Sequence, residues 1–205
     1  MDKMAVVPKR VVGNLILDKT SFFCCDIQEK FRPVIKYFDD IVLVSKRLVS
    51  AASILDSPLV VTEQYPKGLG KTVAELEIDN AVGVFPKTKF TMLIPEVKEA
   101  MTSLCGGTLE HIILFGIEAH VCVQQTALDL LSLGYDVHVV ADAVSSRSQM
   151  DRQFAFERLR QAGAVVTTSE AVLLQLVGDK EHAKFKDIQS LIKTSAPVSG
   201  LVSQL

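Results

Sequence analysis

The sequence predicts an α/β protein in which helices cover both faces of an open, mostly parallel sheet. Short apolar runs typical of buried strands alternate along the chain with amphipathic stretches of about 10 to 15 residues. Such alternation indicates right-handed βαβ crossovers. No internal repeat or shift in composition divides the 205 residues, which fit one domain. Residues 1–17 and the tail after residue 194 are expected to lie outside its core.

The predicted strands are short and apolar. Residues 21–25 form a continuous apolar run, which is typical of a strand buried on both faces, and the run ends at Asp26. Residues 111–117 form the clearest buried strand. Further strands are expected at 59–62, 82–85, 135–141 and 164–166.

The predicted helices lie between these strands. Apolar residues recur at helical spacing from 41 to 55, Pro95 suits the first position of a helix, and Gly134 and Gly163 suit the positions just after one. Between the second strand and the third, residues 64–70 contain a Tyr-Pro pair and two glycines, which predicts a surface loop able to act as a lid. Helices are expected at 41–55, 95–104, 119–133, 149–161, 169–176 and 182–193.

Composition and charge exclude several classes of protein. Hydrophobic residues make up 48% of the chain and charged residues 22%, as in ordinary folded domains. A net charge of -2 gives no general attraction for nucleic acids or anionic membranes, and no apolar run is long enough to span a bilayer. Four cysteines without a CxxC pattern suit a reducing compartment, so a cytoplasmic location is expected. A mitochondrial presequence within residues 1–10 stays an alternative.

Three side chains capable of chemistry come at strand ends, where open parallel sheets bind ligands. Asp26 follows the first strand, Lys87 follows the third, and Cys122 lies near the start of the helix after the fourth. A helix N-terminus and a nearby ammonium both favour a reactive thiolate. Asp26 could then take the thiol proton as a general base.

Each of these residues also has a simpler explanation. A buried cysteine usually packs as a small apolar side chain, an aspartate after a strand usually caps a turn, and a lysine is usually solvated. The spacing alone therefore leaves both interpretations of Cys122 open. The other cysteines, Cys24, Cys25 and Cys105, are assigned to packing.

Three motifs together resemble the isochorismatase-like cysteine hydrolase family over residues 21–177. They are residues 25–31 (CDIQEKF), 87–91 (KTKFT) and 116–123 (GIEAHVCV). Residues 62–70 (TEQYPKGLG) and 173–176 (LLQL) are similar to the eukaryotic isochorismatase domain-containing members. The resemblance implies a three-layer sandwich around a six-stranded parallel sheet in the order 3-2-1-4-5-6. The first and fourth strands are then neighbours.

The resemblance also implies roles for particular residues. Asp26, Lys87 and Cys122 would form the catalytic triad, with Lys87 rather than Lys89 as its lysine. A cis peptide bond would precede Glu118, so that the backbone N–H groups of Glu118 and Cys122 form an oxyanion hole. Candidate substrate-binding residues, which equally fit a packing role, are Gln28, Phe31, Tyr65, Phe90 and His120.

No metal or other cofactor is expected. Nicotinamidases of the family bind a metal through Asp and His residues near the pocket, whereas residues 64–70 contain no histidine. The four histidines of the chain are scattered, and two of them fall in predicted strands. The run 145–148 (SSRS) after the fifth strand fits a substrate contact, a subunit contact or a helix-capping turn.

The resemblance favours hydrolysis of a small amide or related carbonyl compound through a thioester on Cys122. Isochorismatases themselves cleave a vinyl ether without a cysteine, so the presence of Cys122 points to acyl chemistry. One alternative is a binding or scaffold protein with an inactive triad. Another is a ribonuclease, although the chain has no basic run and an acidic pI of about 6.1. The expected partners are a small-molecule substrate and further copies of the chain, without nucleic acid or membrane.

Overall fold

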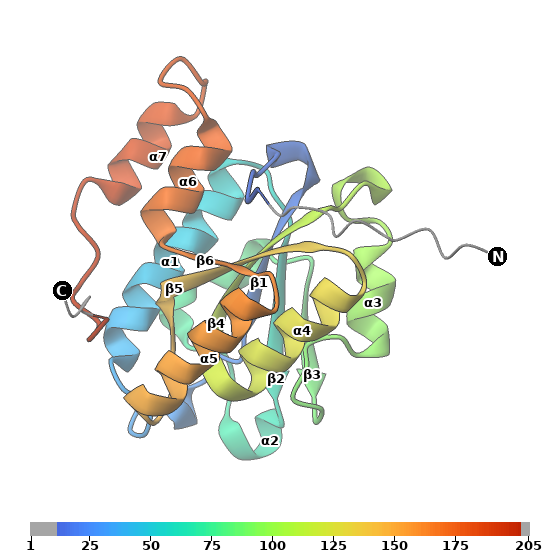
Figure 1. Cartoon of the computed structure of the whole chain (residues 1–205), viewed down its shortest axis with the longest axis vertical. Coiled ribbons are helices and arrows are strands. Elements are labelled where there is room, and N and C mark those ends of the chain that lie inside the picture. The colour runs from blue at the N-terminus through green and yellow to red at the C-terminus, as the bar shows by residue number, and fades with distance from the viewer. Residues whose placement is uncertain (1–11, 202–205) are drawn as a thin grey trace.

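The structure is a computed structural model that describes residues 12–201, folded as three layers with the sheet in the middle (Figure 1). All neighbouring strands pair in parallel, in the order β3-β2-β1-β4-β5-β6. The predicted fold class and strand order are therefore confirmed. The strands are β1 (Thr20–Cys25), β2 (Leu59–Gln64), β3 (Gly83–Lys87), β4 (His111–Ile117), β5 (Asp136–Ser145) and β6 (Val165–Thr167).

Helices cover both faces of the sheet. On one face α1 packs with α6 and α7, and on the other α4 packs against α5 (Figure 1). Short 3-10 turns lie at 17–19, 29–31, 74–76, 78–80 and 104–107, and a π-helical turn spans Ala119–Val123. The α-helices are α1 (Phe38–Ile54), α2 (Pro66–Leu69), α3 (Pro95–Met101), α4 (Gln124–Ser132), α5 (Gln149–Gln161), α6 (Ser169–Val177) and α7 (Phe185–Ile192).

The two central strands hold the core. Every residue of β1 and of β4 is buried, as their continuous apolar runs predict for strands covered on both faces. Their lengthwise pairing runs from Thr20 opposite His111 to Cys25 opposite Gly116. The chain order of the sheet reverses between these two strands, so their carboxyl ends form the topological switch point at which such sheets bind ligands.

Several element boundaries differ from the prediction. Lys87 is the last residue of β3 instead of the residue after it. The helix expected at 119–133 is a π-helical turn followed by α4. The loop expected at 64–70 is wrong in part, because Gln64 still belongs to β2 and the four residues Pro66–Leu69 form α2. Proline at the first position of this helix has no N–H to leave unpaired.

Parts of the two end segments contact the domain. Leu15 is buried in the core, and the Gln175 side chain donates a hydrogen bond to the Gly13 carbonyl. Near the other end, Ser199 is buried and its carbonyl accepts a hydrogen bond from Arg152 Nη1 at 2.6 Å. Residues 1–11, which include the possible presequence at 1–10, and residues 202–205 lie outside the described part of the chain.

Candidate active site

The candidate site begins where β1 and β4 approach each other most closely. Gly116 lies opposite Cys25, and a Cβ atom at this position would be 2.0 Å from the Cys25 carbonyl oxygen. Its φ of +124° is also one that side-chain-bearing residues rarely adopt. Glycine is therefore required at 116 to bring the two strand ends together.

Asp26 turns the chain at the end of β1. It adopts a left-handed conformation with φ of 53°, which aspartate tolerates better than most residues. Its N–H donates to the Thr62 carbonyl at 3.2 Å, and its Oδ1 accepts from Thr62 Oγ1 at 2.8 Å. Asp26 is fully buried, so these bonds from β2 fix its carboxylate in one orientation.

Lys87 supplies a positive charge to that carboxylate from the end of β3. Its Nζ lies 2.6 Å from Asp26 Oδ2, and both side chains are buried. The same ammonium donates to Gln64 Oε1 at 2.6 Å and to the carbonyls of Phe90 and Lys89 at 2.9 and 3.1 Å. Burial disfavours the ammonium, but the nearby Cys25, Asp26 and Cys122 outweigh this and raise the pKa of Lys87. Lys87 is therefore held in its charged form.

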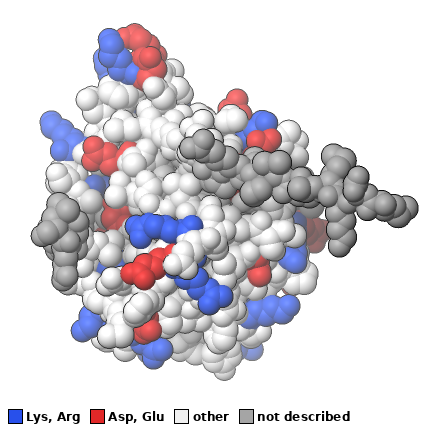
Figure 2. All heavy atoms as spheres, viewed as in Figure 1, with Lys and Arg blue, Asp and Glu red and all other residues white. Residues whose placement is uncertain are grey.

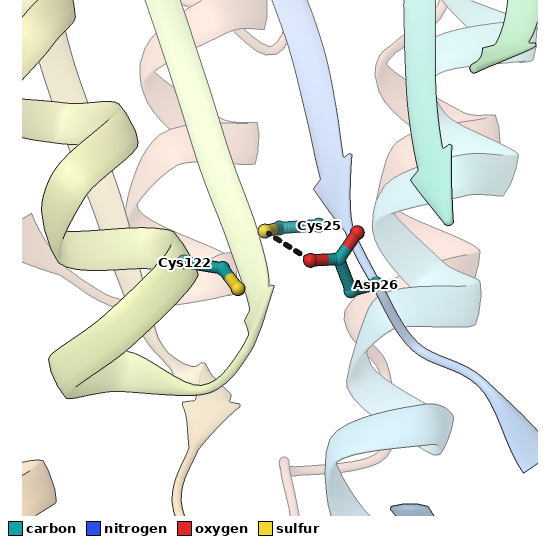
Figure 3. A group of neighbouring side chains, drawn as sticks. All are labelled: Cys25, Asp26 and Cys122. Atoms are coloured by element: carbon teal, nitrogen blue, oxygen red, sulfur yellow. Dashed lines mark hydrogen bonds between the residues drawn. The ribbon is translucent and has the colours of Figure 1, made fainter. Parts of the chain in front are cut away.

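Cys122 lies on the π-helical turn that follows β4. Its Sγ, the Cys25 Sγ and a carboxylate oxygen of Asp26 all lie within 4.8 Å of one another, and Figure 3 shows the three side chains converging between β1 and this turn. The turn begins just after a cis peptide bond between Ile117 and Glu118, the bond that the resemblance implies. On either side of Cys122, the N–H groups of Val121 and Val123 donate to the Glu118 carbonyl at 3.1 and 3.2 Å, so these two donors are already used.

Cys25 is the site residue that the sequence reasoning missed. Its assignment to packing has to be corrected, because its Sγ donates a hydrogen bond to Asp26 Oδ2 at 3.6 Å. Burial, a hydrogen bond with Cys122 and the charge of Asp26 raise the pKa of Cys25 well above its usual value, which keeps it a neutral thiol. Cys24 is buried within β1, and Cys105 Sγ instead contacts the Thr20 carbonyl.

Residues 145–148 form hydrogen bonds with the segment that leads to Cys122. Glu118 Oε2 accepts hydrogen bonds from the backbone N and the Nε of Arg147 at 3.0 and 3.2 Å. His120 Nδ1 lies 3.0 Å from Ser146 Oγ. Of the three interpretations of this run, helix capping is observed, since Ser148 Oγ accepts from the Asp151 N–H at the start of α5.

The remaining candidate residues differ in how deeply they are buried. Gln28 is fully buried, and its amide bonds the backbone of Gln64 and of Gly70, which ties residues 64–70 to β1 and β2. Tyr65 and Phe90 are each about half exposed, at 55% and 52%. Phe31 is partly buried against the core. The substrate-binding role of these residues stays a prediction.

The described residues offer a possible metal site at the same place. Among residues 12–201, the single group of three or more side chains able to hold a metal ion is Cys25, Asp26 and Cys122. The Lys87 ammonium is already paired with the Asp26 carboxylate at 2.6 Å, and a metal ion would have to displace it. The absence of a catalytic metal stays the expectation.

The fold and the site together define a class of protein: open parallel α/β proteins with Asp, Lys and Cys side chains clustered at the sheet's switch point. The isochorismatase domain model matches residues 20–171, and the chain belongs to the isochorismatase family. It is 59% identical to isochorismatase domain-containing protein 1 of Salmo salar over 195 residues, covering 95% of this chain and 68% of that protein. It is 48% identical to isochorismatase domain-containing protein 2 of Homo sapiens over 193 residues, covering 93% and 91%.

Solved structures agree with this assignment. A structure named MAR1 ribonuclease from Caenorhabditis elegans superposes with a TM-score of 0.88 at 52% identity, covering 94% of this chain and 98% of that one. The YcaC gene product of Escherichia coli, described as an octameric hydrolase of unknown specificity, gives a TM-score of 0.77 at 23% identity and coverage of 87% and 90%. The second likeness shows the fold alone. Within residues 12–201, no helix has the length and apolar character needed to cross a membrane.

Proposed function

We propose that this member of a hydrolase family cleaves a small amide or related carbonyl compound through a thioester on Cys122. The observation that carries the proposal is the carboxylate of Asp26, which Thr62 and Lys87 hold in place within 4.8 Å of the Cys122 thiol. A buried carboxylate next to a thiol can take its proton, and a nucleophile with its base in reach is the arrangement that covalent catalysis needs.

Each group has a role in the proposed reaction. Asp26 takes the proton of Cys122, whose sulfur attacks the carbonyl carbon. Backbone N–H groups of Glu118 and Cys122 stabilise the oxyanion, a contribution of about 3 kcal/mol per donor in other enzymes. The proton on Asp26 passes to the leaving amine as the C–N bond breaks. Asp26 then takes a proton from a water whose oxygen attacks the thioester carbonyl carbon. The C–S bond breaks, the carboxylic acid leaves, and the proton on Asp26 returns to the Cys122 sulfur.

Lys87 has an electrostatic role in this scheme. Its ammonium compensates the Asp26 carboxylate, and the charge of that carboxylate is one of the causes that raise the pKa of Lys87. Gln64 and the carbonyls of Lys89 and Phe90 hold the ammonium in place, so Lys87 is the fixed charge around which protons move.

The test is ammonia release from a panel of small primary amides. We expect at least one amide to be turned over by the wild-type chain and by Cys24→Ser, but not by Cys122→Ala. Cys24→Ser is the control because Cys24, like Cys122, is a buried thiol, but it lies within β1 and does not belong to the cluster. Equal turnover by the wild type and Cys122→Ala would refute the thioester. A panel without any turnover would favour the binding or scaffold alternative.

Ribonuclease activity stays an alternative, because the C. elegans structure carries the name ribonuclease, although a name is not evidence of that activity. Figure 2 shows acidic side chains interspersed with the basic ones on the face drawn, which is unlike the basic surfaces that bind RNA. RNA cleavage that is lost in Lys87→Ala, with contaminating nucleases excluded, would support it. Cleavage that survives in Lys87→Ala and Cys122→Ala would come from another source.

Assembly and location complete the proposal. Isologous contacts between identical subunits are the commonest arrangement in soluble oligomers, and we expect two or more copies of this chain to associate in solution. The described cysteines are all free thiols, which supports a reducing compartment such as the cytoplasm. Sedimentation and fractionation of the tagged chain test these two expectations separately.

A further inference from the structure

Cys25 is the nucleophilic side chain of the cluster to which the proposed hydrolysis gives no role. Its sulfur lies within 4.8 Å of the Cys122 sulfur, beside the Asp26 carboxylate. Figure 3 shows that the two thiol side chains come from different elements, β1 and the π-helical turn, and enter the same space. Two thiols from separate elements facing one another are an arrangement that a disulfide can join.

We propose that Cys25 and Cys122 form a redox-active dithiol: a peroxide oxidises Cys122, and Cys25 then closes a disulfide with it. In the first step the Cys122 thiolate attacks a peroxide oxygen. An S–O bond forms as the O–O bond breaks, which leaves Cys122 as a sulfenic acid, and the released hydroxide becomes water with the proton that Asp26 took from the Cys122 thiol. In the second step the Cys25 sulfur attacks the Cys122 sulfur, the S–O bond breaks, and the departing hydroxide leaves as water with the Cys25 proton.

The geometry suits this order of events. Bonded sulfurs are about 2 Å apart, so the two sulfurs have less than about 3 Å to close, a distance that rotation of one side chain about its Cα–Cβ bond covers. Cys122 keeps 7% of its surface exposed whereas Cys25 has none, so a peroxide meets Cys122 first. Asp26 Oδ2, 3.6 Å from the Cys25 sulfur, is placed to pass the Cys25 proton to the departing hydroxide.

The charge of Lys87 and the burial of Cys25 indicate which cysteine reacts with the peroxide and which one closes the disulfide. The Lys87 ammonium next to this cluster favours a thiolate and a negatively charged leaving group. Burial and its two hydrogen-bond partners raise the pKa of Cys25, so Cys25 stays protonated until a sulfenic acid forms beside it. Cys122 is therefore the sulfur that reacts with the oxidant, and Cys25 is the one that resolves it. The disulfide removes the thiol that the proposed hydrolysis uses.

The experiment treats the full chain with equimolar hydrogen peroxide, records its intact mass, unfolds it in urea so that buried thiols such as Cys24 can react, blocks the free thiols with N-ethylmaleimide, and maps the peptides by mass spectrometry. We expect the intact mass to fall by two hydrogen atoms, a cross-linked pair of peptides containing Cys25 and Cys122, and blocking of two cysteines instead of four. Dithiothreitol should restore all four. Cys24→Ser and Cys105→Ser, as matched controls, should still form the cross-link.

The Cys25→Ser and Cys25→Ala variants separate the two steps. In a variant that folds, Cys122 should stop at the sulfenic acid, which dimedone traps, and should proceed to higher oxides with excess peroxide. Wild-type chain oxidised at Cys122 without a cross-link to Cys25 would overturn the proposal, as would a cross-link to Cys24 or Cys105. The cross-link is detected by mass spectrometry without any substrate, so this experiment does not depend on the proposed hydrolysis. Iodoacetamide labelling of Cys122 in chain that forms no cross-link would leave the proposed function standing.

Discussion

Replacing Lys87 with methionine tests whether the buried ion pair holds the site together. Lys87→Met keeps a long, flexible side chain but removes the ammonium, which leaves the Asp26 carboxylate with the Thr62 hydroxyl and the Cys25 thiol as its remaining side-chain donors. Both members of the pair are at most 1% exposed, so water cannot replace the lost charge. Removal of one partner from a buried pair costs about 3 to 5 kcal/mol.

This cost is measurable by urea unfolding. The chain contains no tryptophan, so far-ultraviolet circular dichroism is the suitable signal. With a slope of about 2 kcal/mol per molar urea for a domain of this size, the midpoint should fall by about 2 M. Adding Asp26→Asn to Lys87→Met should recover part of the loss, because the unpaired charge is then gone. A loss below about 1 kcal/mol, as for exposed pairs, or additive effects of the two substitutions would refute the buried pair.

Two further predictions concern positions outside the triad. Burial, and the charge of His111, lower the pKa of His138 to about 4, so the unfolded chain binds the extra proton below about pH 6.5. The free energy of unfolding should therefore decrease as the pH is lowered from 7 to 5. His138→Leu should make this decrease smaller by about 2 kcal/mol in urea titrations. An equal decrease in the variant and the wild type would contradict this. Gly116→Ala should cost more than about 4 kcal/mol, because its Cβ meets the Cys25 carbonyl. Gly106→Ala, also at positive φ but in open space, should cost only about 1 to 2 kcal/mol, and equal losses would contradict the close contact.

Sequence patterns predicted the central strands well because a strand that is buried on both faces requires a continuous run of apolar residues. The runs that form β1 and β4 are apolar throughout, which only strands covered on both faces require. Strand order came from the resemblance, since periodicity carries no information about which strands are neighbours. The limits of β5 were missed because its last residues, up to Ser145, pair with β4 beyond a register shift, and such irregularities have no reliable local signal.

The sequence predicted that Asp26, Lys87 and Cys122 lie near one another, but it did not predict that Cys25 joins them. Asp26, Lys87 and Cys122 lie at strand ends, and parallel strands bring their carboxyl ends to one edge. Cys25 was missed because side chains alternate along a strand, so neighbours are expected on opposite sides. The left-handed backbone at Asp26 breaks this alternation. Aspartate tolerates the left-handed backbone conformation, so an aspartate directly after a buried strand is a signal that the alternation of side chains can end there.

The reactivity of Cys122 tests the central claim most directly. Limiting iodoacetamide, an amide with a leaving group, is added to the reduced full chain, and the alkylation of each cysteine is followed over time by peptide mapping. Cys105 is the more exposed thiol, whereas Cys122 is buried apart from 7% of its surface, so exposure alone favours labelling of Cys105. If Asp26 and Lys87 activate Cys122, it should be alkylated first, and Lys87→Met should slow that reaction but not the reaction at Cys105. Faster labelling of Cys105, with Cys122 left unmodified, would contradict a nucleophilic role for Cys122.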